Sequence, residues 1–178
     1  MNLPEHVVLG GGVAWALSPV LGVQGSAIFW VASVLIDADH YGDYLHRNGF
    51  RDWSPRRMFE FHARVFPQIR RPDFLALNLC HTVEFFTFVY VAAAVLRSSV
   101  LWAVFWGMCF HLLLDVIWLA WHRAVFSRAF SLIEYAIRRR RMRDRGLDPN
   151  LVYEEVLVAM GVTRPEPAPL LSSRSSSS

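Results

Sequence analysis

Lysine is absent from the 178 residues, and all eighteen basic side chains are arginines. Because 15 residues are acidic, the net charge is only +3, but the arginines are gathered in local stretches. Such stretches can bind nucleic acid, yet beside apolar helices they more often contact phospholipid headgroups or mark the cytoplasmic side of a membrane. The distribution of arginine therefore indicates a lipid bilayer as the partner in preference to nucleic acid.

Cysteine is almost as scarce, since Cys80 and Cys109 are the only two and both lie in apolar segments. Two such residues build neither a disulfide framework nor a zinc ribbon, and we interpret them as small buried side chains. The glycines at 10–12 are followed by no lysine, so the chain also lacks a P-loop. These absences exclude a disulfide-stapled domain and a P-loop nucleotide-binding protein.

Apolar side chains are abundant, at 54% of the residues, and they form four segments at 7–17, 20–36, 74–96 and 100–121. A helix needs roughly 20 residues to cross a bilayer, so the last two segments are long enough and the first two are near or below that length. Short turns join the segments in pairs. We therefore predict an all-α fold in which two helical hairpins form a membrane-embedded four-helix bundle.

The polar stretches are expected to contain amphipathic helices. Near 54–70, Ser54 can cap a helix whose apolar side chains share one face, and we predict that this helix lies on the membrane surface. Residues 1–125 would form the membrane-embedded domain, 126–163 basic amphipathic helices and 164–178 a disordered tail. Because these polar stretches hold nearly all the arginines, both termini are expected on the cytoplasmic side.

Ionisable residues recur at one end of the four apolar segments. They are His6, Asp37, Asp39, His40, His81, Glu84, His111 and Asp115. At a rise of about 1.5 Å per residue, the two hairpins would bring all of them within roughly 10 Å of the cytoplasmic boundary. A carboxylate inside a membrane helix costs about 2.5–3.5 kcal/mol even on the lenient insertion scale, so such groups usually face a partner.

Helical spacing groups an imidazole with a carboxylate three times. Each pair would share one helix face, because its members are three or four positions apart. The pairs are Asp37 with His40, His81 with Glu84, and His111 with Asp115. Any single histidine is more often a hydrogen-bonded core residue than a ligand, and residues 37–40 could simply end a helix in water. A shared metal site, however, explains all three pairs together, and a set without thiolates suits a catalytic site with open positions.

Four short motifs resemble those of a known family. A histidine ahead of a glycine-containing helix (EHVVLGGG), then DADH, CHTVEFF and HLLLD, are similar to motifs of the bacterial membrane-bound metal-dependent hydrolases. This family includes inner-membrane hydrolases described as LexA-binding, and the likeness covers residues 5–120. The helical His/Asp set is also distantly similar to that of zinc-dependent phospholipase C. The resemblance implies a bacterial inner-membrane location, metal dependence and hydrolase activity.

We therefore predict one or two divalent metal ions, zinc first and manganese or iron as alternatives. The expected ligands are His6, Asp37, His40, His81, His111 and Asp115. Asp39 or Glu84 would orient a metal-bound water or accept its proton. A lipid-headgroup phosphoester is the expected substrate, because the site should lie just beneath the interface. Arginines that could contact its phosphate are Arg47, Arg51 and Arg123.

Three other functions stay open on the sequence alone. Paired helical histidines can ligate haem, in which case the purified protein would show a Soret band. The same carboxylates could relay ions in a transporter, although four short segments would then require an oligomer. Finally, the basic run at 138–145 could bind a partner or, less favoured, nucleic acid while the rest of the chain serves as a membrane anchor.

Overall fold

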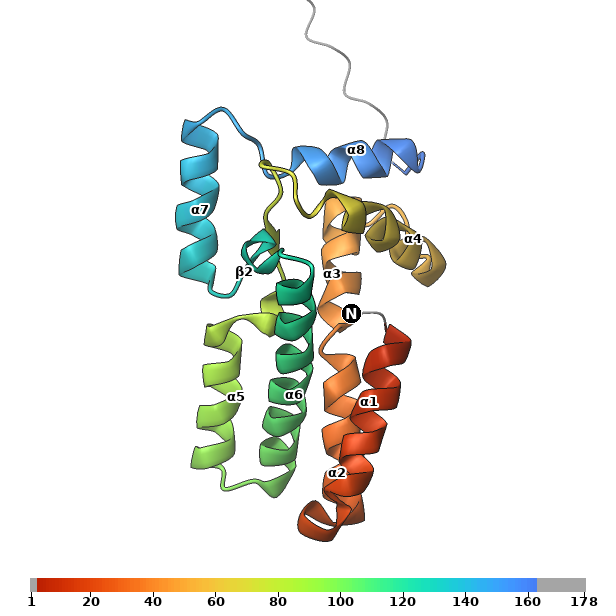
Figure 1. Ribbon diagram of the computed structural model, residues 1–178, viewed down its shortest axis with the longest axis vertical. Coiled ribbons are helices and arrows are strands. Elements are labelled where there is room, and N and C mark those ends of the chain that lie inside the picture. The colour runs from red at the N-terminus through yellow and green to blue at the C-terminus, as the bar shows by residue number, and fades with distance from the viewer. Residues whose placement is uncertain (1–2, 163–178) are drawn as a thin grey trace, which may run out of the picture.

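The structure is a computed structural model that describes residues 3–162, and this part of the chain is mostly helical (Figure 1). The tail predicted at 164–178 lies outside the described residues. The helices are α1 (Leu3–Ala16), α2 (Ser18–Leu35), α3 (Ala38–Arg47), α4 (Pro55–Val65), α5 (Val83–Val95), α6 (Ser99–Trp121), α7 (Leu132–Asp144) and α8 (Leu151–Ala159). Two short strands complete the fold, β1 (Ala76–Leu77) and β2 (Arg128–Ala129).

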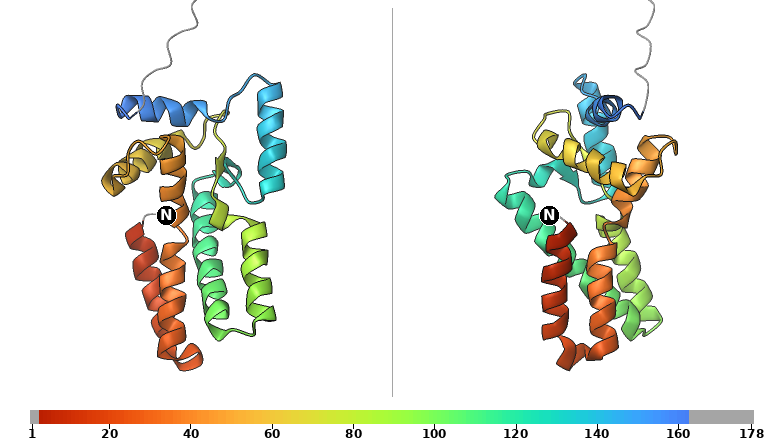
Figure 2. Two further views of the ribbon diagram at one scale, coloured as in Figure 1. Left: turned by 180° about the vertical axis from the view of Figure 1, so that it is seen from behind. Right: turned by 90° about the vertical axis from the view of Figure 1, so that its right-hand side faces the viewer.

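The apolar helices α1, α2, α5 and α6 lie side by side in one half of the molecule (Figures 1 and 2). Helix α2 packs against both α1 and α6, and α5 packs on α6. Two stretches, Ser18–Arg47 and Ser99–Trp121, are long and apolar enough to cross a membrane. With 14 and 13 residues, α1 and α5 reach only about 20 Å at 1.5 Å per residue, less than the roughly 30 Å of a hydrocarbon core.

Large apolar side chains cover the outer surface of this half. Trp15 is 80% exposed, Val23 84% and Val95 73%, and Phe88, Trp106 and Ile117 are also exposed. Soluble monomers rarely leave so much apolar area in contact with water. The surface therefore requires a cover, such as lipid or another protein.

The sequence predicts one helix over the third apolar segment, 74–96, but the structure does not contain it. Residues 74–82 are extended or turned, because β1 pairs in parallel with β2 and places Ala76 opposite Arg128. A 3-10 turn, Leu79–His81, follows the strand, and α5 begins only after Thr82, whose hydroxyl caps it. The apolar composition indicated burial, but it could not indicate backbone pairing with a segment so distant in the chain.

The helix predicted near 54–70 is confirmed as α4, with the Ser54 side chain accepting a hydrogen bond from the backbone N–H of Arg57 at 3.4 Å. Its apolar face, however, is covered by protein and not by a membrane surface. Phe61 and Val65 pack with Val152 and Leu157 of α8 in one core. An amphipathic pattern requires that one face be buried but does not specify what buries it. Because α8 belongs to this core, the described residues on either side of 125 pack together.

Close packing of α2 on α6 gives a test of the fold. A methyl group on Gly107 of α6 would overlap the carbonyl oxygen of Phe29 in α2, whereas one on Gly12 of α1 would meet nothing within 4 Å. We expect Gly107→Ala to destabilise the protein by about 1–3 kcal/mol through overpacking. The control Gly12→Ala should raise stability by up to about 1 kcal/mol, because alanine favours the helix.

Thermal unfolding of the detergent-solubilised protein, followed by circular dichroism, measures both changes. Equal unfolding temperatures for the two variants would contradict this packing of α2 against α6.

Candidate metal centre

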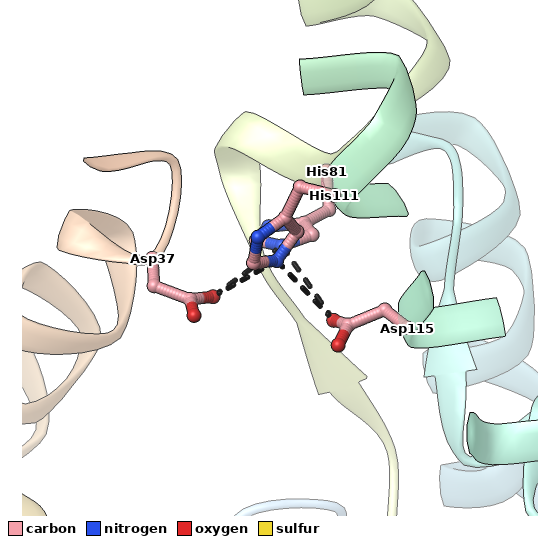
Figure 3. A group of neighbouring side chains, drawn as sticks. All are labelled: Asp37, His81, His111 and Asp115. Carbon is pink, nitrogen blue, oxygen red and sulfur yellow. Dashed lines mark hydrogen bonds and ion pairs between the residues drawn. The ribbon is translucent and has the colours of Figure 1, made fainter. Parts of the chain in front are cut away.

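Four potential ligand atoms converge where the apolar helices meet the polar half of the molecule (Figure 3). Asp37 lies just after α2, His81 lies in the turn before α5, and His111 and Asp115 are one turn apart on α6. One atom from each side chain lies within 4.8 Å of all the others, and every residue of the group except the half-buried Asp37 is buried. The cluster could therefore hold a metal ion.

The spacing of these atoms matches a single tetrahedral ion. The Nε2 atoms of His81 and His111 are 3.2 Å apart. Asp37 Oδ1 lies 3.3 Å from Nε2 of His111 and 3.6 Å from Nε2 of His81. Asp115 Oδ2 lies 3.6 Å and 3.8 Å from the same two nitrogens. Ligands at about 2.0–2.1 Å from zinc are separated by roughly 3.3–3.4 Å in a tetrahedron, so these five separations differ from a tetrahedral site by at most about half an ångström. The two carboxylate oxygens lie within 4.8 Å of each other.

The hydrogen bonds of the two imidazoles decide which nitrogens face the centre. Nδ1 of His111 donates to the carbonyl oxygen of Ser33 at 2.8 Å, and Nδ1 of His81 donates to Asp39 Oδ2 at 3.1 Å. Neither acceptor has a proton to give, so in the neutral rings both protons are on Nδ1. Two Nε2 lone pairs and two carboxylate oxygens then point at one another. Four such acceptors in a buried site require a cation, either a metal ion or a proton on one ring.

At His81, burial of the ring favours a metal ion over a proton. The ring is buried, and this burial lowers the pKa of His81 below its ordinary value. A protonated His81 is therefore disfavoured, whereas a neutral imidazole is the form that binds metals.

Asp39 holds the rings and does not face the centre. Its Oδ2 accepts from the backbone N–H of Cys80 at 3.0 Å as well as from His81, and its Oδ1 lies 3.0 Å from Nδ1 of His40. On a straight helix Asp39 would point elsewhere, but the break between α2 and α3 turns it toward the segment before α5. A carboxylate that fixes the tautomer of a metal-binding histidine is a recurring companion of metal sites.

A second ligand group shares one residue with the first. His40, Asp39 and Asp37 also bring one atom each within 4.8 Å of one another, and His40 Nδ1 lies 3.3 Å from Asp37 Oδ1. The backbone carbonyl of His40 accepts from Nε2 of His62 at 3.0 Å. Burial lowers the pKa of His62 to about 4, which keeps this ring neutral. No local pattern indicated a role for His62, because it lies among the polar residues of an amphipathic helix.

His6 packs directly against the cluster. Its ring stacks on His111 with centroids 3.9 Å apart, and its Nε2 lies 3.3 Å from Asp115 Oδ1. Within the described residues, Nδ1 of His6 is buried without a hydrogen-bond partner. A buried imidazole nitrogen of this kind fits a metal site, because such nitrogens are ordinarily satisfied and a bound ion would satisfy it.

Arg128 also contacts the cluster, and no sequence pattern indicated that it would. Its Nη1 donates to Asp115 Oδ2 at 2.9 Å, and its side chain is 11% exposed. Only the pairing of β2 with β1 brings this arginine to the cluster, so no local pattern could have indicated it. One of the four converging oxygens and nitrogens therefore already has a cationic neighbour.

Glu84 is not part of the cluster, contrary to our expectation for the His81–Glu84 pair. Its Oε1 accepts from the hydroxyl of Ser131 at 2.6 Å and from the backbone N–H of Leu132 at 3.0 Å, at the start of α7. The helical pair does not form, because α5 begins after His81.

The three arginines expected around a phosphate are not brought together. Arg47 forms an ion pair with Asp43 at 2.7 Å and lies over the ring of Tyr153, 3.5 Å from its centroid. Arg51 lies in the loop after α3. Arg123 follows α6 and lines a different pocket.

Two further interpretations concern cysteine and haem. Burial raises the pKa of Cys80 to about 11, so this thiol stays protonated, in agreement with its interpretation as a small buried side chain.

For haem, the Nε2 atoms of His81 and His111 are only 3.2 Å apart with carboxylates beside them, which leaves no room for a porphyrin between the rings.

Comparisons with protein-family models, with the curated proteins and with the solved structures gave no match. The resemblance to membrane-bound metal-dependent hydrolases therefore stays a prediction, and the evidence for a metal site is its geometry.

Metal content tests the cluster directly. We expect the detergent-purified protein to carry zinc, manganese or iron near one equivalent or above, and His111→Ala to lose it while keeping its helicity. His46→Ala is the matched control, because His46 is exposed at the end of α3. Elemental analysis after dialysis against trace metal measures the difference. Equal metal content in the two variants would exclude His111 as a ligand.

Asp39 provides a second test that removes no ligand of the first group. We expect Asp39→Asn to weaken metal binding by about 10- to 100-fold, because His81 loses the carboxylate that fixes its orientation. Competition with a chromophoric chelator measures the dissociation constant. Asp144→Asn, an exposed change on α7, should leave it unaltered. A dissociation constant unchanged in Asp39→Asn would contradict the positioning role.

Proposed function

We propose that this protein is a membrane-bound metal-dependent hydrolase that directs a metal-activated water at an ester or phosphoester. The observation that carries the proposal is the convergence of two imidazole nitrogens and two carboxylate oxygens on one buried point. This donor set, rich in nitrogen and oxygen and free of thiolate, is typical of hydrolytic metal sites. The resemblance of the DADH and HLLLD motifs to the hydrolase family supports the same function.

The membrane location is supported by the apolar half of the molecule. Its exposed tryptophan, valine and phenylalanine side chains would face lipid, and the arginines of the polar half would lie on the cytoplasmic side of a bacterial inner membrane. The short α1 and α5 fit a locally thinned bilayer or tilted insertion. In this arrangement, the four apolar helices form the membrane-embedded bundle and the cluster lies at its cytoplasmic end.

A bound divalent ion, with zinc favoured and manganese or iron as alternatives, would supply a water of lowered pKa and polarise the scissile group. His81, His111, Asp37 and Asp115 would hold it, and Asp39 would keep His81 in the binding tautomer. Asp37 is shared with His40, so a second ion has a place beside the first.

The substrate would reach the cluster from one side. The side chains of His40 and Asp37 are 24% and 22% exposed, whereas those of His81 and Asp115 are 0% and 6% exposed. Water and substrate would therefore approach beside Asp37, where His40 would exchange a proton with them.

Turnover of chromogenic esters tests the proposal. We expect the purified protein to hydrolyse at least one of the p-nitrophenyl phosphate monoester, the bis-p-nitrophenyl diester and the p-nitrophenyl carboxylic ester. Chelation should abolish the turnover, and zinc, manganese or iron should restore it. Asp37→Asn should lower the rate by at least about 100-fold, because a ligand beside the reacting water is lost. The exposed change Asp144→Asn should not lower it.

Turnover that persists after elemental analysis has shown complete removal of metal would refute the proposal. Absence of turnover of all three esters with metal bound would confine the cluster to ion binding.

A further inference from the structure

A pocket of about 660 Å³ lies between α7, the turn after α6 and the segment that follows α4. Six arginines line it, namely Arg70, Arg71, Arg123, Arg138, Arg141 and Arg145. No acidic side chain lines it. Three of these arginines belong to the basic run at 138–145, which has no role in the proposed hydrolase.

Most of this positive charge has no acidic partner. Arg71 pairs with Asp73 and with Glu155, each at 2.6 Å, and Arg138 pairs with Glu134 at 2.9 Å. In the part of the chain that the structure describes, the other four arginines form no ion pair. They are Arg70, Arg123, Arg141 and Arg145. Because like charges gathered in one pocket repel one another, an anion bound among them would be strongly favoured.

The arginines are held there by the fold and not merely by a basic stretch of sequence. On α7, Arg138 and Arg141 are three positions apart and so share one helix face, and Arg145 lies directly after the helix; all three line the pocket. Arg70 donates through Nε and Nη2 to the backbone carbonyl of His122, at 3.2 Å and 2.7 Å, which leaves its charge uncompensated. Arg123 has a left-handed backbone, with φ of 53°, at the end of α6, where glycine is the usual residue.

The lining also indicates the chemistry of the ligand. Guanidinium groups bind phosphate oxygens in paired hydrogen bonds, and a phosphate monoester offers two charges. Ile69, Phe74 and Met142 add an apolar wall, and Phe126 at the rim is 83% exposed. An anion that also carries an apolar part satisfies both surfaces.

We infer that this arginine pocket is a binding site for a phosphate-bearing amphiphile. The phosphate can belong to the headgroup of an anionic phospholipid or to a soluble phosphorylated compound. The inference goes beyond the proposed hydrolase, because the pocket binds its ligand whether or not the buried His/Asp cluster holds a metal ion.

The binding experiment uses the full chain in non-ionic detergent with metal removed, so that its outcome is independent of hydrolysis. Calorimetric titration compares dihexanoyl phosphatidic acid with dihexanoyl phosphatidylcholine, which has the same acyl chains and no net charge. Pyrophosphate represents the soluble source of phosphate. We expect phosphatidic acid to bind and phosphatidylcholine not to bind. Pyrophosphate that binds as tightly as phosphatidic acid would show that the apolar wall contributes nothing and would overturn the amphiphile as the ligand, whereas much weaker pyrophosphate binding would support it.

Two pairs of variants locate the binding. Arg141→Gln with Arg145→Gln removes two pocket charges, and Arg140→Gln with Arg143→Gln removes two exposed charges from the same helix outside the pocket. The first pair should raise the dissociation constant by at least about tenfold, since charge-assisted hydrogen bonds to phosphate are stronger than neutral ones. The second pair should change it by less than about twofold.

Arg123→Gly separates loss of binding from loss of folding. Glycine relieves the left-handed backbone at this position, so the thermal unfolding temperature should stay the same or rise. The affinity for phosphatidic acid should nevertheless fall. Equal weakening by the two glutamine pairs, or the absence of binding to both phosphatidic acid and pyrophosphate, would overturn the inference. A single-stranded oligonucleotide that binds more tightly than both, and with equal sensitivity to both pairs, would overturn it in favour of nucleic acid.

Discussion

The structure depends on one electrostatic constraint, the burial of several acceptor atoms around a common point. Imidazole nitrogens and carboxylate oxygens that face one another without a proton are unfavourable unless a cation joins them. The surrounding features keep those atoms in place. The break after α2 delivers Asp37 and turns Asp39 toward His81, and the carbonyl of Ser33 holds His111. The polar half of the molecule is thereby tied to the apolar half through the cluster.

The sequence was sufficient to predict most of the residues that converge at this site, but not the backbone arrangement that brings them together. His111 and Asp115 could be placed together because four positions make one helical turn, and both lie in a continuous helix. His81 was also identified, yet for a wrong reason, since its expected partner Glu84 bonds to Ser131 instead. Local periodicity predicts neither a helix break nor a pairing between distant strands. Those two features decide where Asp39 and Arg128 lie.

The same limit explains the outcome for the amphipathic helices. The pattern in α4 correctly predicted one buried face, but the cover is α8, about 100 residues further along the chain, and not lipid. Similarly, the sequence left open whether the basic run at 138–145 binds a partner, whereas in the structure three arginines of this run line a pocket with arginines from two other segments. In both cases the sequence identified a face, and only the tertiary structure identified what meets it.

The parallel pairing of β1 with β2 has a consequence for how the protein folds. Although the ladder is only two residues long, it joins positions that are 52 apart in sequence, Ala76 and Arg128, and it precedes His81 by one turn. Closing so long a loop is slow compared with forming a helix, so this pairing is expected late on the folding pathway. A register slip of one residue would reverse the faces of one strand relative to the other and carry Arg128 away from Asp115. A metal ion held by this cluster would therefore require that the β1–β2 pairing has formed in its correct register.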